Sequence, residues 1–186
     1  MTTVITRPRP VPLTVAVAGS VALAARPPLL RAAPDATQLL VALFVVLLAA
    51  GALLPVASAR LSVNARSSLA VLAVGTGAFA LGRLLGGGEP PAVLTAKLVA
   101  LNTLAAIGEE AFFRRLVFDT LRAGGDAIAV VGSALLFAVV HLPVYGLWVL
   151  PIDLAAGLVL SWQRWATGRW SVPAVTHVVA NLLVVI

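Results

Sequence analysis

Long apolar runs, separated by short breaks, follow one another along almost the whole chain. A helix that crosses a bilayer needs about 20 mostly apolar residues. The runs that approach this length are 11–25, 37–57, 67–86, 91–110 and beyond, 125–142, 145–162 and 171–186. We therefore predict an all-α fold, a polytopic transmembrane bundle of about seven helices.

Composition supports a membrane protein and excludes several other classes. The chain is 61% hydrophobic and 11% charged, whereas a soluble domain is about 45–50% apolar and about 25% charged. The breaks are too short for a second domain, so residues 1–186 are expected to form a single integral membrane domain. The Lys and Arg residues lie at the edges of apolar runs, which argues against nucleic-acid binding. The absence of cysteine excludes thiolate ligands.

Positive charge predicts the orientation of the chain, because inner loops are rich in Lys and Arg. If the N-terminus lies inside, the inner segments hold Arg7, Arg9, Arg60, Arg66, Arg114, Arg115, Arg122, Arg164 and Arg169, and the outer segments hold Arg26, Arg31 and Arg83. We expect a multi-pass protein of the bacterial inner membrane with a cytoplasmic N-terminus. Ala22-Leu23-Ala24 imitates a signal-peptide cleavage site, but we interpret this segment as an uncleaved first helix, because many spans follow.

The ionisable residues at or within the apolar runs include Glu109, Glu110, His141 and His177. Ionisable groups inside a membrane protein are costly and by default indicate function. Glu109 and His141 each lie 16 residues from Gly125. If Gly124-Gly125 is the turn of a helical hairpin, both side chains lie roughly 24 Å from it, at about 1.5 Å per residue.

This hairpin requires the first arm to continue as a helix through Arg114–Arg122, with those charges near the cytoplasmic surface. Glu110 and Arg114 are four residues apart, a spacing that favours an ion pair on a helix. We expect Arg114 to hold Glu110 and to leave Glu109 free toward the cavity. His177 follows Gly168 by nine residues, so it could reach the same site on the last helix.

Three motifs in this order resemble those of the CPBP/Abi family of intramembrane proteases. They are Glu109-Glu110-x-x-x-Arg114, Phe137-x-x-x-His141 and His177-x-x-x-Asn181. That family includes the type II CAAX prenyl endopeptidases and bacteriocin-processing proteins. The resemblance covers about residues 91–186, while the first three spans carry no diagnostic residue.

The resemblance implies an endopeptidase that hydrolyses a peptide bond of a membrane-embedded or lipid-anchored protein. Glu109 would activate water with help from His141, while His177 and Asn181 would orient the substrate carbonyl or stabilise the oxyanion. Glu110, Arg114 and Phe137 would support them. CAAX cleavage, removal of a bacteriocin leader and processing of a C-terminal sorting signal all remain open as the reaction.

Alternative functions use the same residues. Two histidines and one glutamate are a known catalytic zinc set, which here would be Glu109, His141 and His177, although the contiguous H-E-x-x-H motif is absent. No other cofactor is expected. A small carrier could relay protons through Glu109, His141 and Asp153, and a non-catalytic binding or immunity protein could retain the family shape. Asp153 lines a water path or pairs with Arg164, and Asn102 borders the cavity or packs between helices.

Overall fold

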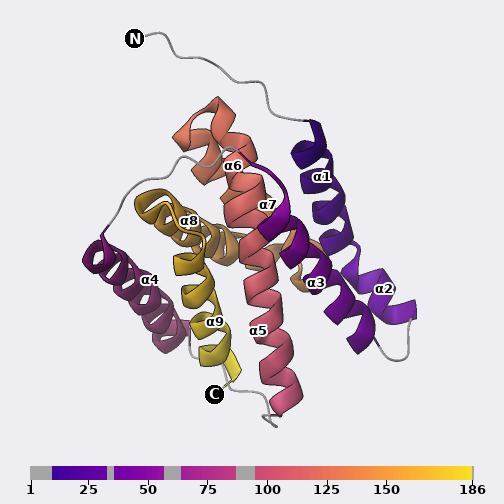
Figure 1. Cartoon of the computed structure of the whole chain (residues 1–186). Coiled ribbons are helices and arrows are strands. Elements are labelled where there is room, and N and C mark those ends of the chain that lie inside the picture. Colours follow the sequence, from indigo (N-terminus) through magenta and orange to yellow (C-terminus); the bar gives the residue numbers. More distant parts are fainter. Residues whose placement is uncertain (1–9, 33–35, 57–63, 87–94, 186) are drawn as a thin grey trace.

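The computed structural model describes residues 10–32, 36–56, 64–86 and 95–185, and every element in these ranges is helical (Figure 1). In chain order they are α1 (Pro10–Ala24), α2 (Arg26–Ala32), α3 (Thr37–Leu53), α4 (Ala65–Gly86), α5 (Ala96–Glu110), the π-helix η1 (Ala111–Val117), α6 (Phe118–Leu121), the 3-10 turn η2 (Arg122–Gly124), α7 (Asp126–Tyr145), the 3-10 turn η3 (Leu147–Val149), α8 (Leu150–Thr167) and α9 (Ser171–Val185). The predicted all-α fold is confirmed.

Several of these helices are suited to a bilayer. Helices α4 and α7 are long and apolar enough to cross one, and α1 with α2, which meet at a bend of 48°, would make a third span. Helices α3 and α9 are apolar but shorter. Large apolar side chains also stand exposed, among them Leu53, Leu84 and Leu85, as expected of a surface that faces lipid. The chain is a membrane protein whose described elements are all helical, while its number of spans stays a prediction.

Two predicted breaks differ from the structure. The segment after α1 forms the short helix α2 (Arg26–Ala32), although the predicted runs 11–25 and 37–57 leave a break between them. Helix α7 also continues past Leu142 and through Pro143. Proline has no N–H to donate to the carbonyl four residues earlier, and the helix ends two residues after it. The helix ends at Gly146, whose φ is 86° and whose N–H donates to the Leu142 carbonyl at 2.8 Å.

The helices that carry the motif residues meet inside the bundle. Helix α5 packs between α3 and α9, α7 pairs with α8, and α4 lies on the outer side of α8 and α9 (Figure 1). The predicted hairpin is present. Helix α5 continues through η1 and α6 to η2, and the chain reverses at Gly125, whose φ of 112° favours glycine. The helix expected through Arg114–Arg122 is therefore confirmed.

The approach of α3 to the π-helix depends on one glycine. A Cβ built on Gly51 would lie 2.3 Å from the carbonyl carbon and oxygen of Ala111. No real Cβ comes so close to backbone atoms, so a larger residue at this position must push α3 away from η1.

We expect Gly51→Ala to lower the free energy of unfolding by about 1–3 kcal/mol, the usual cost of an overpacked interior. The measurement is thermal unfolding of the purified protein in detergent. Gly77→Ala is the matched control, because a Cβ there would meet nothing within 4 Å and alanine favours a helix. Equal stability of Gly51→Ala and the wild type would contradict the prediction.

Candidate active site

Both glutamates end α5 and are buried, and the π-helix begins directly after them. Two carbonyls of η1 receive side-chain donors from neighbouring helices. Ser133 of α7 donates to the Phe113 carbonyl at 2.9 Å, and Arg164 of α8 donates through Nε to the Arg114 carbonyl at 2.7 Å. Short π-helical stretches are rare and frequent at functional sites. Here contacts from α7 and α8 stabilise the π-helix η1.

Glu110 lies in a buried charged cluster with Arg114 and His177. Arg114 is fully buried, and its Nη1 lies 3.2 Å from Glu110 Oε1, as the four-residue spacing predicts. His177 of α9 reaches the same oxygen through Nδ1 at 2.8 Å. Arg114 Nη2 also donates to the Gly157 carbonyl at 3.4 Å. This cluster joins α5, η1, α8 and α9 at one point.

Glu109 faces His141 across the hairpin. Oε2 of Glu109 lies 3.8 Å from Nε2 of His141, so the structure brings the two side chains together as their equal distance from Gly125 predicts. His141 Nδ1 lies 2.7 Å from the Phe137 carbonyl. Because a carbonyl only accepts hydrogen bonds, Nδ1 must carry the proton, and in the neutral ring Nε2 is then a bare acceptor facing Glu109.

The expectation that Glu109 is free toward the cavity is wrong. Nη1 of Arg26 lies 3.3 Å from Glu109 Oε1, so the carboxylate is paired with a cation from α2. Sequence reasoning missed Arg26 because we placed it in an outer segment and saw no diagnostic residue in the first three spans. A contact over 83 residues of chain leaves no local signal in the sequence.

Three arginines of the predicted inner segments bind groups inside the helical bundle. Arg114 is buried, and Arg164 is buried against Asp119, whose Oδ1 accepts from Arg164 Nη2 at 2.7 Å. Arg115 donates to the carbonyls of Gly51 and Leu54 near the end of α3. Acids and carbonyls of the bundle thus compensate these arginines, and the cytoplasmic N-terminus stays a prediction.

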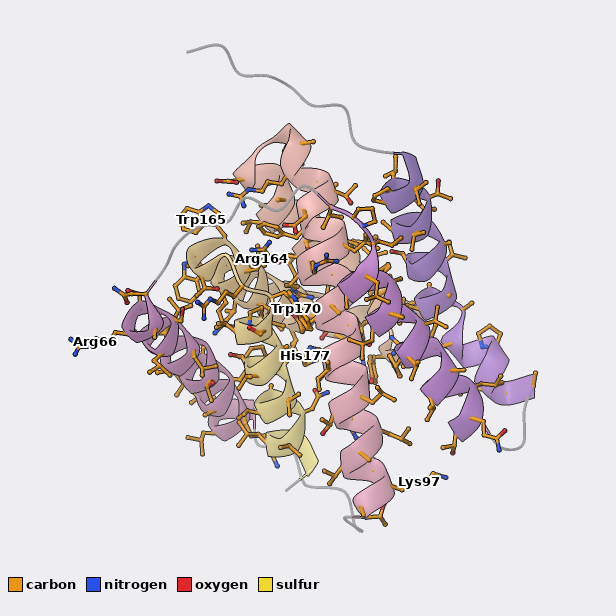
Figure 2. All side chains as sticks on the ribbon, in the orientation of Figure 1. Arg66, Lys97, Arg164, Trp165, Trp170 and His177 are labelled. Atoms are coloured by element: carbon orange, nitrogen blue, oxygen red, sulfur yellow. The ribbon has the colours of Figure 1, made fainter. Side chains whose placement is uncertain are left out.

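Figure 2 shows this contrast between interior and peripheral basic side chains. Arg164 and His177 lie among the helices of the bundle, whereas Arg66 and Lys97 extend from its edge.

The alternative that Asp153 pairs with Arg164 is also wrong. Asp153 Oδ2 lies instead 3.9 Å from His141 Nδ1, which places this carboxylate beside the site.

Phe137 stands between the two acid–histidine pairs. Its ring centroid lies 4.6 Å from that of His141 and 5.8 Å from that of His177. The guanidinium of Arg114 lies 4.4 Å from the same ring, close enough for a cation–π contact. Phe137 therefore packs against both histidines and separates Glu109–His141 from Glu110–His177.

Asn181 is not brought to the Glu109–His141 pair. Its Nδ2 donates to the Asn102 carbonyl of α5 at 3.3 Å, and Asn102 lies seven residues before Glu109, about two turns of helix. The Asn102 side chain in turn donates to the Leu98 carbonyl at 2.9 Å. Asn181 thus connects α9 to α5, while the Asn102 side chain bonds within α5.

The histidines and acids do not fit a metal site. No group of three or more His, Asp or Glu side chains in the part of the chain that the structure describes is arranged to hold a metal ion. The zinc set considered above is divided, because His177 approaches Glu110 through Nδ1 while His141 approaches Glu109. The residues present therefore do not support zinc ligation.

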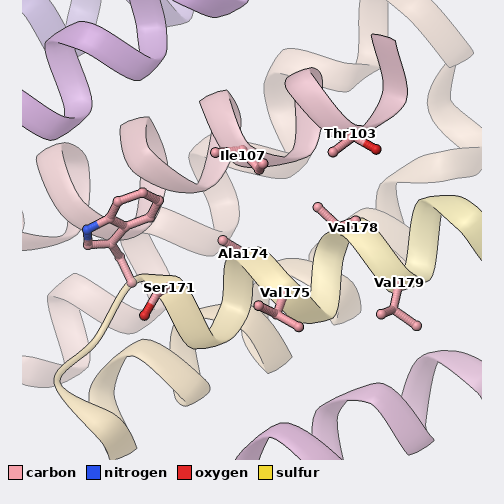
Figure 3. Close-up of a pocket in the computed structure, with 8 residues that line it drawn as sticks. Thr103, Ile107, Ser171, Ala174, Val175, Val178 and Val179 are labelled. Carbon is pink, nitrogen blue, oxygen red and sulfur yellow. The ribbon is translucent and has the colours of Figure 1, made fainter. Parts of the chain in front are cut away.

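An apolar groove of about 390 Å³ runs between α5 and α9, the helices that carry Glu110 and His177 (Figure 3). It is lined by Thr103, Ile107, Trp170, Ser171, Ala174, Val175, Val178 and Val179. The groove lies beside the acid–histidine cluster and contains none of its residues. Its mostly aliphatic lining is suited to binding an apolar ligand and offers few polar groups for chemistry.

Comparisons with known proteins identify the family. The model for type II CAAX prenyl endopeptidase Rce1-like proteins matches residues 91–183, half of the chain. Comparisons with curated proteins and with solved structures give no match. The matched stretch contains all three motifs, so the resemblance stated from them is confirmed. The chain belongs to the Rce1-like family of type II CAAX prenyl endopeptidases.

Proposed function

We propose that this protein is a glutamate-dependent intramembrane endopeptidase that hydrolyses a peptide bond of a membrane-embedded or lipid-anchored protein. Family membership implies protease activity in the membrane. The observation that carries the finer proposal is the buried Glu109 carboxylate at 3.8 Å from His141 Nε2. Side chains of this kind can activate water inside a bundle that lacks a metal-binding set among its described residues.

The distance between Glu109 and His141 suits a shared water. At 3.8 Å the two atoms are too far apart for a direct hydrogen bond. A water between them would donate one hydrogen to Glu109 Oε2 and the other to His141 Nε2, which leaves its lone pair for the substrate carbonyl. As the water oxygen bonds to the carbonyl carbon, Glu109 takes a proton. The C–N bond then breaks, and the proton passes to the leaving amine nitrogen.

The second acid has a positioning role in this proposal. Glu110 Oε1 contacts Arg114 at 3.2 Å and His177 Nδ1 at 2.8 Å, so no water fits between Glu110 Oε1 and His177 Nδ1 as it can between Glu109 and His141. The resemblance implies that His177 and Asn181 serve the oxyanion. In this structure His177 Nδ1 contacts Glu110, and Asn181 Nδ2 donates to the Asn102 carbonyl of α5. We therefore assign these two side chains to holding α9 against α5.

The groove between α5 and α9 supports a lipid-anchored or otherwise apolar substrate. It lies alongside the helices of the site, and its lining is aliphatic apart from Thr103, Trp170 and Ser171. An isoprenoid or apolar peptide tail placed there would hold the adjoining peptide bond near α5 and α9. The substrate class named by the family, a prenylated CAAX tail, is therefore the first to test.

The direct test is cleavage by the purified full-length protein in detergent. The substrates are a farnesylated peptide that ends in a CAAX sequence and unprenylated peptides with apolar C-terminal tails, and mass spectrometry identifies the fragments. Cleavage that persists with a strong chelator supports the proposal. Cleavage lost with chelator and restored by zinc would contradict the glutamate mechanism in favour of the metal version.

Absence of cleavage with every peptide would favour the other functions. A short series of titratable groups runs through the site: Glu109 Oε2 lies 3.8 Å from His141 Nε2, and His141 Nδ1 lies 3.9 Å from Asp153 Oδ2. Proton flux across liposomes containing the protein, without cleavage, would therefore assign these residues to a carrier. Neither flux nor cleavage would leave a binding protein.

A further inference from the structure

Helix α2 brings a cation into the site from outside the stretch that the family model matches. Arg26 begins α2 directly after the bend that separates it from α1. Its Nε donates to the Leu23 carbonyl at 2.9 Å, and its guanidinium lies 5.8 Å from the ring of Phe44 on α3. These contacts from two helices fix the guanidinium where its Nη1 meets Glu109 at 3.3 Å.

One nitrogen of this guanidinium is left without a partner. The Arg26 side chain is only 11% exposed, and its Nη2 is buried without a hydrogen-bond partner among the described residues. An unsatisfied donor on a buried cation costs free energy, so such an atom next to a proposed catalytic carboxylate calls for an explanation. A ligand oxygen that is present only when substrate is bound would satisfy it.

Peptide hydrolysis moves negative charge across this same region. Glu109 becomes neutral as it takes a proton from water, while the oxygen of the attacked carbonyl becomes negative. A guanidinium that contacts Glu109 through one nitrogen and has another N–H to donate can stabilise negative charge first on Glu109 and then on the carbonyl oxygen. Donors placed in advance at the developing oxyanion are among the largest contributions to catalysis.

We propose that Arg26 is a catalytic residue of this peptidase, with Nη1 orienting Glu109 and Nη2 donating to the oxyanion of the scissile carbonyl. The inference rests on the proposed function. It assigns to α2 a role beside the motif helices, where His177 Nδ1 contacts Glu110 and Asn181 Nδ2 donates to the Asn102 carbonyl. It also gives the N-terminal helices, which carry none of the three motifs, a direct part in the reaction.

The test compares Arg26→Gln and Arg26→Lys with Arg31→Gln, a control that removes the same charge from an exposed position on the same helix. For Arg26→Gln we expect kcat to fall about 100- to 1,000-fold, the usual effect of removing one oxyanion donor, with little change in KM. Arg26→Lys retains charge and a donor and should recover part of the loss. A phosphonate peptide that mimics the tetrahedral intermediate should bind Arg26→Gln more weakly, while an uncleaved peptide binds it normally.

The outcomes separate this inference from the proposed function. Wild-type kcat in Arg26→Gln would overturn the inference alone, provided that Glu109→Gln is inactive. The inference would also be overturned by the following combination of results. Arg26→Gln loses kcat but binds the phosphonate as the wild type does, and Arg26→Lys recovers no activity although it is as thermally stable as the wild type. Turnover by Glu109→Gln, or none by the wild type, would overturn the proposed function and the inference with it.

Discussion

Replacing Glu109 by glutamine is expected to lower kcat by about 100- to 10,000-fold, the range in which a general base contributes to catalysis. Glutamine keeps the shape of the side chain and an oxygen that can accept from Arg26, which lies 3.3 Å from the carboxylate. It cannot take a proton from the water that His141 helps to position. The loss should therefore appear in kcat and leave substrate affinity nearly unchanged.

Two further variants make this experiment specific. Asp126→Asn removes a carboxylate at the hairpin turn, where it contacts Arg122 and Trp165, and we expect turnover near that of the wild type. Glu110→Gln should lose activity together with thermal stability, because Glu110 is held by Arg114 and His177. Glu109→Gln should lose activity with a smaller fall in melting temperature, because its pair with Arg26 is less completely buried than the Glu110–Arg114 pair. Near-normal turnover by Glu109→Gln would exclude Glu109 as the base.

The sequence predicted the hairpin and the meeting of Glu109 with His141 because both follow from constant geometry. Each helical residue advances the chain by a fixed rise, so two residues equidistant from a glycine turn lie beside each other when the arms pack. The pairing of Glu110 with Arg114 follows equally from the surface of one helix. Local spacing was sufficient for these contacts.

Contacts between distant segments could not be predicted in the same way. The π-helix after Glu110 depends on Ser133 and Arg164, which donate to its carbonyls from α7 and α8. The position of Arg26 depends on the bend between α1 and α2. Counting arginines as surface charges also failed, since Arg114 and Arg164 are compensated by acids inside the bundle. Charge pairing over long sequence separations decides these positions, and a single sequence does not reveal it.

Arg114→Met is expected to lower the free energy of unfolding by about 3–5 kcal/mol, the cost of removing one partner from a buried ion pair. The Glu110–Arg114 pair is fully buried on both sides, so the remaining carboxylate would keep only His177 as a partner. Unfolding of the purified protein in detergent measures the effect. Arg122→Met is the matched control, because its pair with Asp126 is more exposed and such pairs contribute only about 0–1 kcal/mol.

The double variant Glu110→Gln/Arg114→Met identifies the cause of that loss. Removing both members of a buried pair is often nearly neutral, so the double variant should regain most of the stability that Arg114→Met loses. If it stays as unstable as the single variant, the contribution of Arg114 comes instead from its contacts with the Phe137 ring and the Gly157 carbonyl. If Arg114→Met is no less stable than Arg122→Met, the buried cluster does not hold α5, η1, α8 and α9 together, and the positioning role of Glu110 must be abandoned.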